Sequence, residues 1–235
     1  MRPKLLIEGL ATFFLCLACA LVQGPLAPLI IGALLLALIY AGGPVCQAHY
    51  NPAVTLAFCV RGRQAWSVGA AYMGVQLAAA VVAAVVAGLF HGHSEENGQR
   101  ILEALQEPVF DGWFAGMAAE FLGTFLLALV ILMVATSRRT IGNNYYGLAI
   151  AATVVGLMGI FAAHYPDFNP AVALSKGLSG CFSVFNAEGN AWLAFQREFS
   201  YLAHSTPRLF LGTLAQVFGG ALAAWAFLAI FPEER

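Results

Sequence analysis

The tripeptide Asn51-Pro52-Ala53 decides the fold, because the same three residues return at Asn169-Pro170-Ala171. Asn is a preferred N-cap whose side chain accepts from free amides of the first helical turn, and Pro is favoured at the next position. Apolar residues follow each copy, so we expect short apolar helices over residues 51–61 and 169–180. A helix of about ten residues rises about 15 Å, half of a membrane core roughly 30 Å thick. Two such half-helices meeting end to end would make one span.

The composition indicates a membrane protein with several spanning helices. Of the 235 residues, 60% are hydrophobic and only 10% are charged, and the mean hydropathy is +0.79. A soluble domain carries far more charge. The net charge of −1 leaves no basic surface for nucleic acid. The five cysteines are an odd number without metal-ligand spacing, so we expect packing residues rather than a disulfide framework, and no metal or cofactor.

Six long apolar runs predict six transmembrane helices, so the expected fold is all-α. Arg2 and Lys4 precede the first run, which makes a signal peptide the alternative, but Glu8 is out of place in a signal core and favours a spanning helix. The second run is expected to lose helical character at Gly42-Gly43-Pro44. The mixed segment 181–208 predicts a short surface helix on the extracellular side that could cover the outer mouth. The runs cover residues 5–22, 29–40, 65–90, 113–136, 146–163 and 209–231.

The two halves of the chain, residues 1–111 and 112–235, repeat each other. In each half a Glu comes first, then Asn-Pro-Ala, then a Gln. Each half has three spans, an odd number, so the second half is inverted relative to the first. Inverted repeats whose broken helices meet at the midplane build a central solute site. The four polar residues are Glu8, Gln76, Glu120 and Gln216.

The basic residues predict the orientation of this multi-pass protein in the cell (inner) membrane. Seven of the eleven Lys and Arg residues fall on one side of the six-span arrangement. Cytoplasmic loops carry the excess of basic residues, so both termini are expected in the cytoplasm. The first half-helix then enters from the inside and the second from the outside. The seven residues are Arg2, Lys4, Arg61, Arg63, Arg138, Arg139 and Arg235.

The pattern resembles the aquaporin and glycerol-facilitator family over nearly the whole chain. A single Asn-Pro-Ala would be a weak signal, but two copies in inverted halves, each preceded by an intramembrane Glu, are highly specific. The resemblance implies a right-handed bundle of six helices and two half-helices, with a pore in each protomer of a homotetramer. It is carried by Glu8, the stretch His49-Tyr50-Asn51-Pro52-Ala53-Val54-Thr55, Gln76, Glu120, Asn169-Pro170-Ala171 and Gln216.

Helix electrostatics give the two motifs a role in excluding ions. Half-helix N-termini carry partial positive charge, so two of them facing each other at the membrane centre repel cations. The amides of Asn51 and Asn169 can donate to a water there, which turns its hydrogens outward and breaks a proton wire. The backbone carbonyls of residues 46–50 and 165–168 are expected to form a row of acceptors.

Polar residues outside the motifs are expected to support the two loops. Glu8 and Glu120 are costly in lipid, so they should face inward and bind the loop amides, with Gln76 and Gln216 in the same supporting group. His49 is interpreted as a buried, hydrogen-bonded loop anchor.

The outer constriction departs from the family pattern. There the second motif is normally followed by Arg, and here that position is Val172. Losing the guanidinium removes a fixed positive charge and the strongest donor. An apolar filter could pass uncharged solutes larger than water, or it could form a dry gate. The predicted filter consists of Ile31, Val154 or Leu157 according to the register, Pro166 and Val172.

Other polar residues leave alternatives open. His164, Arg197 or Arg208 could replace the missing Arg, whereas Asp167 is interpreted as part of a solvated outer loop. His91-Gly92-His93 is interpreted as solvated loop rather than as a metal site.

The expected function is passive permeation of water and small uncharged solutes through a lipid bilayer. A glycerol- or ammonia-type facilitator with low water permeability is the alternative. A coupled transporter is less favoured, because Glu8 and Glu120 are assigned to the loops. An intramembrane enzyme would have only His49, His164 and Asp167 as candidates, and these form no nucleophile–base or metal arrangement.

Overall fold

Six long helices and two half-helices make up the described residues of the computed structural model, which are 1–90, 112–164, 166–182 and 190–234. Short 3₁₀ turns follow some of them, including η1 (Arg138–Thr140), η2 (Ala162–His164) and η4 (Pro232–Glu234). The first half holds α1 (Arg2–Leu21), α2 (Ala27–Cys46), α3 (Pro52–Val60) and α4 (Trp66–Phe90). The second half holds α6 (Trp113–Ala135), α7 (Tyr146–Ile160), α8 (Pro170–Phe182) and α9 (Ala191–Ile230).

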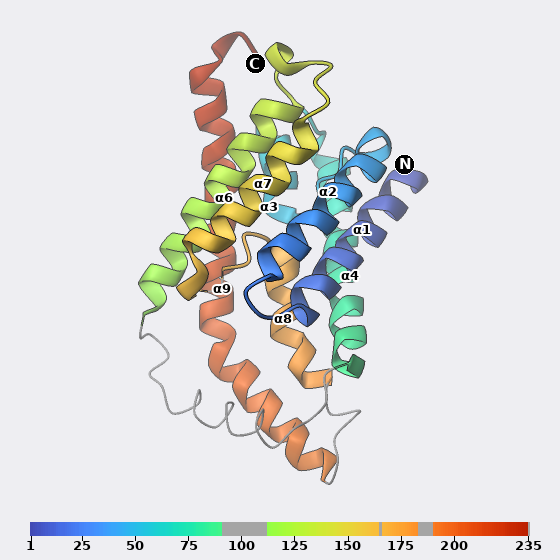
Figure 1. Ribbon diagram of the computed structural model, residues 1–235, viewed down its shortest axis with the longest axis vertical. Helices are drawn as coiled ribbons and strands as arrows, with labels where there is room; N and C mark the ends of the chain where they lie inside the picture. The colour runs from blue at the N-terminus through green and yellow to red at the C-terminus, as the bar shows by residue number, and fades with distance from the viewer. Residues whose placement is uncertain (91–111, 165, 183–189, 235) are drawn as a thin grey trace.

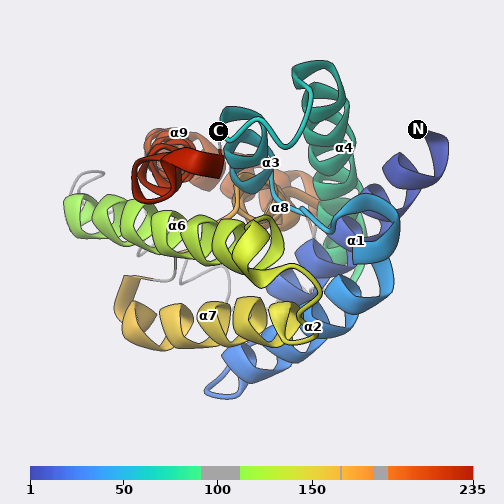
Figure 2. The ribbon, with the colours of Figure 1, turned by 90° about the horizontal axis from the view of Figure 1, so that it is seen from above.

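The packing repeats between the two halves. Helix α1 lies against α4 as α6 lies against α9, while α8 contacts α4 as α3 contacts α9. Figure 1 shows α3 and α8 on opposite sides of the bundle's middle, and both termini at the same end. From above, α1, α2, α7 and α6 follow one another around the bundle, with α3 and α8 between α4 and α9 (Figure 2). The half-helices therefore enter from opposite ends.

The lengths and surfaces of the helices suit a bilayer. Among the described helices, five are long and apolar enough to cross a membrane, and α7 is a shorter apolar helix of 15 residues. Large apolar side chains such as Leu6, Phe14, Leu148 and Trp225 are exposed on the outside of the bundle. Such faces are stable against lipid tails rather than water.

The predicted break in the second span is wrong. Helix α2 continues through Gly42-Gly43-Pro44 and ends at Cys46, where the left-handed Gln47 donates its N–H to the Gly43 carbonyl. Pro44 lies in the last turn of α2, so its missing N–H costs only one hydrogen bond near the end of the helix. Gly42 is needed there because the Tyr50 hydroxyl occupies the place of a side chain.

The last span is also longer than predicted. Instead of a separate surface helix followed by a span from residue 209, α9 is one helix of 40 residues. The Asn190 side chain caps it by accepting from the amides of Trp192 and Leu193. Pro207 lies inside α9 without ending it. The first turns of α9 project past the other helices in Figure 1.

A buried ion pair joins the two halves near the chain termini. The Arg61 guanidinium, at the end of α3, lies 2.6 Å from the Glu234 carboxylate, and both side chains are 1% exposed. The hydroxyl of Ser137 and the amide of Arg138, next to α6, donate to the same carboxylate. Burial opposes ionisation of Glu234, but these donors and Arg61 outweigh it and hold its pKa below the ordinary value.

Candidate pore and solute site

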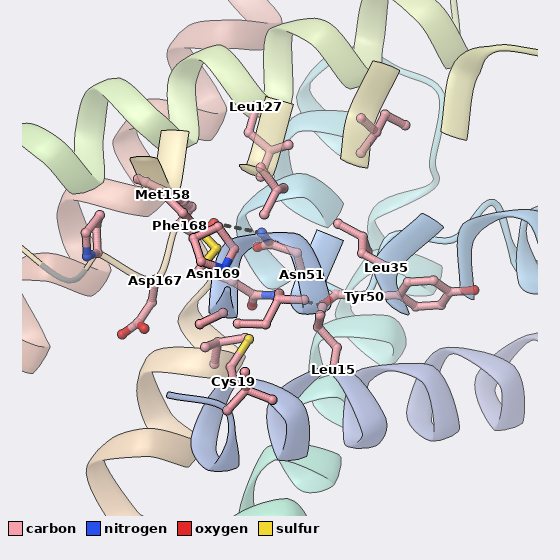
Figure 3. Close-up of a pocket in the computed structure, with 18 of the residues that line it drawn as sticks. Leu15, Cys19, Leu35, Tyr50, Asn51, Leu127, Met158, Asp167, Phe168 and Asn169 are labelled. Atoms are coloured by element: carbon pink, nitrogen blue, oxygen red, sulfur yellow. Dashed lines mark hydrogen bonds between the residues drawn. The ribbon is translucent and has the colours of Figure 1, made fainter. Parts of the chain in front are cut away.

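The two Asn-Pro-Ala motifs meet at the centre of the bundle, and their Asn side chains cross-link the two halves. The Asn51 amide donates to the Phe168 carbonyl at 2.8 Å, and the Asn169 amide donates to the Tyr50 carbonyl at 2.9 Å. Their side-chain oxygens cap the half-helices, accepting from Ala53 and Val54 and from Ala171. Figure 3 shows both Asn residues at the centre of the cavity. Each amide has two N–H groups, so one remains for a solute.

The loop before each motif is held by a glutamate inside the bundle. In the first half, the Glu8 carboxylate accepts from the amides of His49 and Tyr50, both at 2.8 Å, and from the Gln76 side chain at 2.9 Å. Glu8 and Gln76 are both fully buried. Charge-assisted bonds of this kind are stronger than neutral ones and offset the cost of burying a carboxylate.

The second half repeats the same arrangement. The Glu120 carboxylate accepts from the amides of Asp167 and Phe168, at 2.9 and 2.8 Å, and from the Gln216 side chain at 2.9 Å. The four predicted support residues thus lie behind the loops, where they fix the backbone that faces the cavity.

The loops need this support because their backbone is strained. Tyr50 and Phe168, each directly before an Asn, have φ values of 49° and 53°. This left-handed region is costly for large L-residues, and such strain persists only where the surroundings fix it. The carbonyls of these two residues accept from the opposite Asn, so part of the predicted row of acceptors is already used within the protein. Tyr165 lies outside the described residues.

A cavity of about 730 Å³ passes the Asn pair, because its lining reaches Ile39 and Ile150 on one side of the pair and the turn between α1 and α2 on the other. Apolar side chains from four long helices form most of its wall, among them Leu15, Leu35, Leu127 and Met158. The polar groups of its wall gather at the Asn pair and at the end of the cavity beside Asp167 and Lys176. A mostly apolar cavity with a few convergent polar groups is typical of a small-molecule site.

Comparison with known proteins places the chain in a family. A model of the family described as Major intrinsic protein matches residues 6–180. The chain belongs to this family. Aquaporin NIP1-4 of Oryza sativa subsp. japonica is 35% identical over 188 residues, which cover 75% of this chain and 66% of the relative. Aquaporin NIP1-1 of Arabidopsis thaliana is 34% identical over 195 residues, which cover 76% and 65%. The chain thus spans slightly less than two thirds of these relatives' lengths.

A solved structure confirms the predicted fold. The X-ray structure of the aquaglyceroporin from Plasmodium falciparum superimposes with a TM-score of 0.65 at 18% identity, covering 98% of this chain and 97% of that one. At this identity the likeness concerns the fold alone. The family resemblance drawn from the two Asn-Pro-Ala copies is confirmed by the family match.

Most of the predicted filter residues lie on the cavity wall. Ile31, Val154, Pro166 and Val172 all line it and are all buried. Leu157, the alternative to Val154, is buried but is not among the lining residues. At the position where the family resemblance implies an Arg, the wall therefore presents the side chain of Val172.

The residues considered as replacements for that Arg lie elsewhere. His164 is exposed at the end of η2, and Arg197 and Arg208 are on α9. None of the three lines the cavity. The prediction that Asp167 belongs to a solvated loop needs correction, because its side chain lines the cavity and binds Lys176.

Lys176 is the site residue that sequence reasoning missed. The signal was its spacing: it follows Val172 by four residues, which places both on one face of α8. Lys176 therefore faces the same cavity as Val172 and Asn169.

His49 has the contacts of a loop anchor. The residue is 4% exposed, its ring centroid lies 4.0 Å from that of Phe58, and its Nδ1 lies 3.2 Å from the Thr55 hydroxyl. Its Nε2 has no hydrogen-bond partner among the described residues. Within those residues, no group of three His, Cys, Asp or Glu could hold a metal ion, and His91-Gly92-His93 lies outside them.

Proposed function

We propose that the chain forms a passive transmembrane channel for water and small uncharged solutes. The observation that carries the proposal is the meeting of Asn51 and Asn169 across the cavity, from half-helices that enter from opposite ends. Each amide keeps one N–H for a solute that reaches the middle of the bundle. A coupled transporter is disfavoured, because the Glu8 and Glu120 carboxylates are bound to loop amides and the Asp167 carboxylate on the cavity wall is bound to Lys176.

The same arrangement supports exclusion of cations and protons. Helices α3 and α8 both begin at the Asn pair, so their positive dipole ends face each other there. A cation at this point is repelled by both ends. A water that accepts from the two Asn groups turns its hydrogens away from them, which interrupts a chain of hydrogen-bonded waters.

An apolar constriction supports a second candidate, a facilitator of small polar solutes with low water permeability. The sides contributed by Ile31, Val154 and Val172 offer no hydrogen bonds. A water that passes must give up bonds at about 1–3 kcal/mol for each one not replaced. We therefore expect modest water permeability and weak discrimination against small uncharged solutes.

We further propose that the protein is a homotetramer in the cell (inner) membrane with both termini in the cytoplasm. The termini lie at the same end of the bundle (Figure 1), and the basic residues Arg61, Arg63, Arg138 and Arg139 belong to that end. An excess of basic residues is typical of the cytoplasmic side. Light scattering of the detergent-solubilised protein would give the number of chains.

Stopped-flow measurements on proteoliposomes test the channel proposal. Permeabilities for water, glycerol, urea and ammonia are measured without an imposed ion gradient, against empty liposomes and against Val172→Trp, whose indole should fill the constriction. We expect wild-type rates above both controls, and no change when a proton gradient is added. Rates equal to those of empty liposomes would refute a channel, and gradient-dependent rates would indicate a coupled transporter.

A further inference from the structure

A charge pair lies at the outer part of the cavity. The Lys176 ammonium donates to the Asp167 carboxylate at 2.6 Å, and both side chains line the cavity. The Lys176 side chain is 37% exposed and the Asp167 side chain 15%. Lys176 lies one helical turn beyond Val172 on α8. A solute entering from this end therefore meets the pair before the apolar constriction.

The backbone on both sides of the pair is fixed. The Asp167 amide donates to the partly buried Glu120 carboxylate, and Lys176 belongs to a regular turn of α8. In Figure 3 the Asp167 side chain lies on the far side of Asn169 from Tyr50. The two charged groups are therefore held at the mouth by the structure that holds the Asn pair.

The inverted repeat explains why these two side chains meet. Asp167 is two residues before its Asn and Lys176 is seven residues after it. The same positions in the first half are His49 and Phe58, whose ring centroids lie 4.0 Å apart. Both halves thus bring these two positions together. The first half fills them with buried rings, whereas the second fills them with an ion pair exposed to the cavity.

The pair offers hydrogen bonds of both kinds without net charge. An ammonium has three N–H donors and a carboxylate has two acceptor oxygens, and the contact between them uses one of each. Because the charges cancel, neither cations nor anions are favoured at the mouth. A small uncharged molecule with donors and acceptors on neighbouring atoms, such as an amide or a polyol, matches this arrangement.

We propose that Lys176 and Asp167 form a solute-selecting pair at the outer mouth, for uncharged amides and polyols. The pair replaces the hydration that such a solute loses on entering the constriction of Ile31, Val154 and Val172. A solute with several polar groups sheds more water at once than a single water molecule does, so it depends more on the pair. This proposal rests on the channel function proposed above.

Permeability ratios in proteoliposomes test the pair. Lys176→Met and Asp167→Asn should each lower the ratios of urea to water and of glycerol to water roughly fivefold to tenfold, the effect of losing about one hydrogen bond. Lys176→Arg keeps the charge and the donors, so it should retain at least half of the wild-type ratios. Thermal unfolding in detergent is measured for each variant. Loss of stability with unchanged ratios would reduce the pair to a structural role and overturn the proposal.

Chemical rescue separates the ammonium from the fold. Cys19 lines the same cavity, so Lys176→Cys is made together with Cys19→Ser. Modification with aminoethyl methanethiosulfonate restores an ammonium on a chain one atom longer than that of lysine and should restore the ratios. The methyl reagent, which adds no charge, should not. Equal recovery with both reagents would overturn the proposed role of the pair. The same holds if Lys176→Met still conducts and leaves the permeability ratios unchanged. A wild type no faster than empty liposomes would instead refute the channel itself.

Discussion

The two loops that lead into the half-helices have the same frame but different side-chain surroundings. In both, a glutamate binds two successive amides and a glutamine binds the glutamate, with matching distances within 0.1 Å. In the first half, Thr55 completes the network, because its hydroxyl reaches Gln76, His49 and the Asn51 carbonyl. The equivalent position in the second half is Ala173.

Without this hydroxyl, the second loop has fewer side-chain hydrogen bonds behind it. The Gln216 side-chain oxygen is buried and has no hydrogen-bond partner in the part of the chain that the structure describes. The side chain two residues before Asn169 is directed to Lys176 at the cavity mouth, instead of packing inward as His49 does. Backbone support is therefore common to both halves, whereas both charged side chains on the cavity wall, Asp167 and Lys176, come from the second.

The largest effect is expected where the shared frame is broken. Glu8→Gln and Glu120→Gln each replace a carboxylate that accepts three bonds, so each should destabilise the protein by about 3 kcal/mol, with Glu8→Gln the more harmful because Glu8 is fully buried. Thermal unfolding in detergent should show midpoints lower by roughly 6–12 °C. Solute ranking should change little. A variant with the parental midpoint and an altered ranking would contradict the supporting role.

A charge at the meeting point of the half-helices should impair cation rejection. Two half-charges at roughly 8 Å, with an effective dielectric constant of about 20, raise the energy of a cation by about 2 kcal/mol. Asn169→Asp should offset this barrier and increase cation conductance roughly thirtyfold in planar bilayers. Asn51→Asp is the matched variant in the first half and should act similarly. If both variants conduct neutral solute but leak no more cation than the parent, the dipole account is wrong.

Restoring the Arg of the family pattern should narrow the solute range. Val172→Arg places a guanidinium in the constriction, where it fills space and favours water or hydroxyl acceptors. The ratio of glycerol to water permeability should fall about tenfold, which corresponds to about 1.4 kcal/mol. Leu157→Met, at a buried residue outside the cavity wall, is the control. An unchanged ratio in Val172→Arg would show that Val172 does not form the constriction.

The smallest effect is expected from exchanging Thr55 and Ala173. Thr55→Ala should cost about 1 kcal/mol, because it removes the hydroxyl that satisfies Gln76 and His49. Ala173→Thr should gain up to about 1 kcal/mol by giving the Gln216 oxygen a donor. Chemical denaturation in detergent measures both. Equal destabilisation by both changes would show that residue 173 cannot take the place in the hydrogen-bond network that Thr55 has in the first loop.

Much of the fold followed from residues that act locally. Asn at a cap and Pro at the next position fix a helix start wherever they occur, so the half-helices were predicted near their observed bounds. The predictions failed where a long-range contact overrides local propensity. The Tyr50 hydroxyl packs on Gly42 within α2, and Pro207 lies inside α9, which packs along α6. Such contacts join residues that no local pattern relates.

The sequence alone determined that this is an inverted repeat of apolar helices with two Asn-Pro-Ala half-helices, because apolar length, capping residues and repeated order are properties of short segments. The tertiary structure decided which polar groups face the cavity. Asp167 and Lys176 are nine residues apart and look like an ordinary loop and helix surface in the sequence. They form a pair at the mouth because the Glu120 carboxylate holds the loop backbone against α8 while one face of α8 is turned to the cavity.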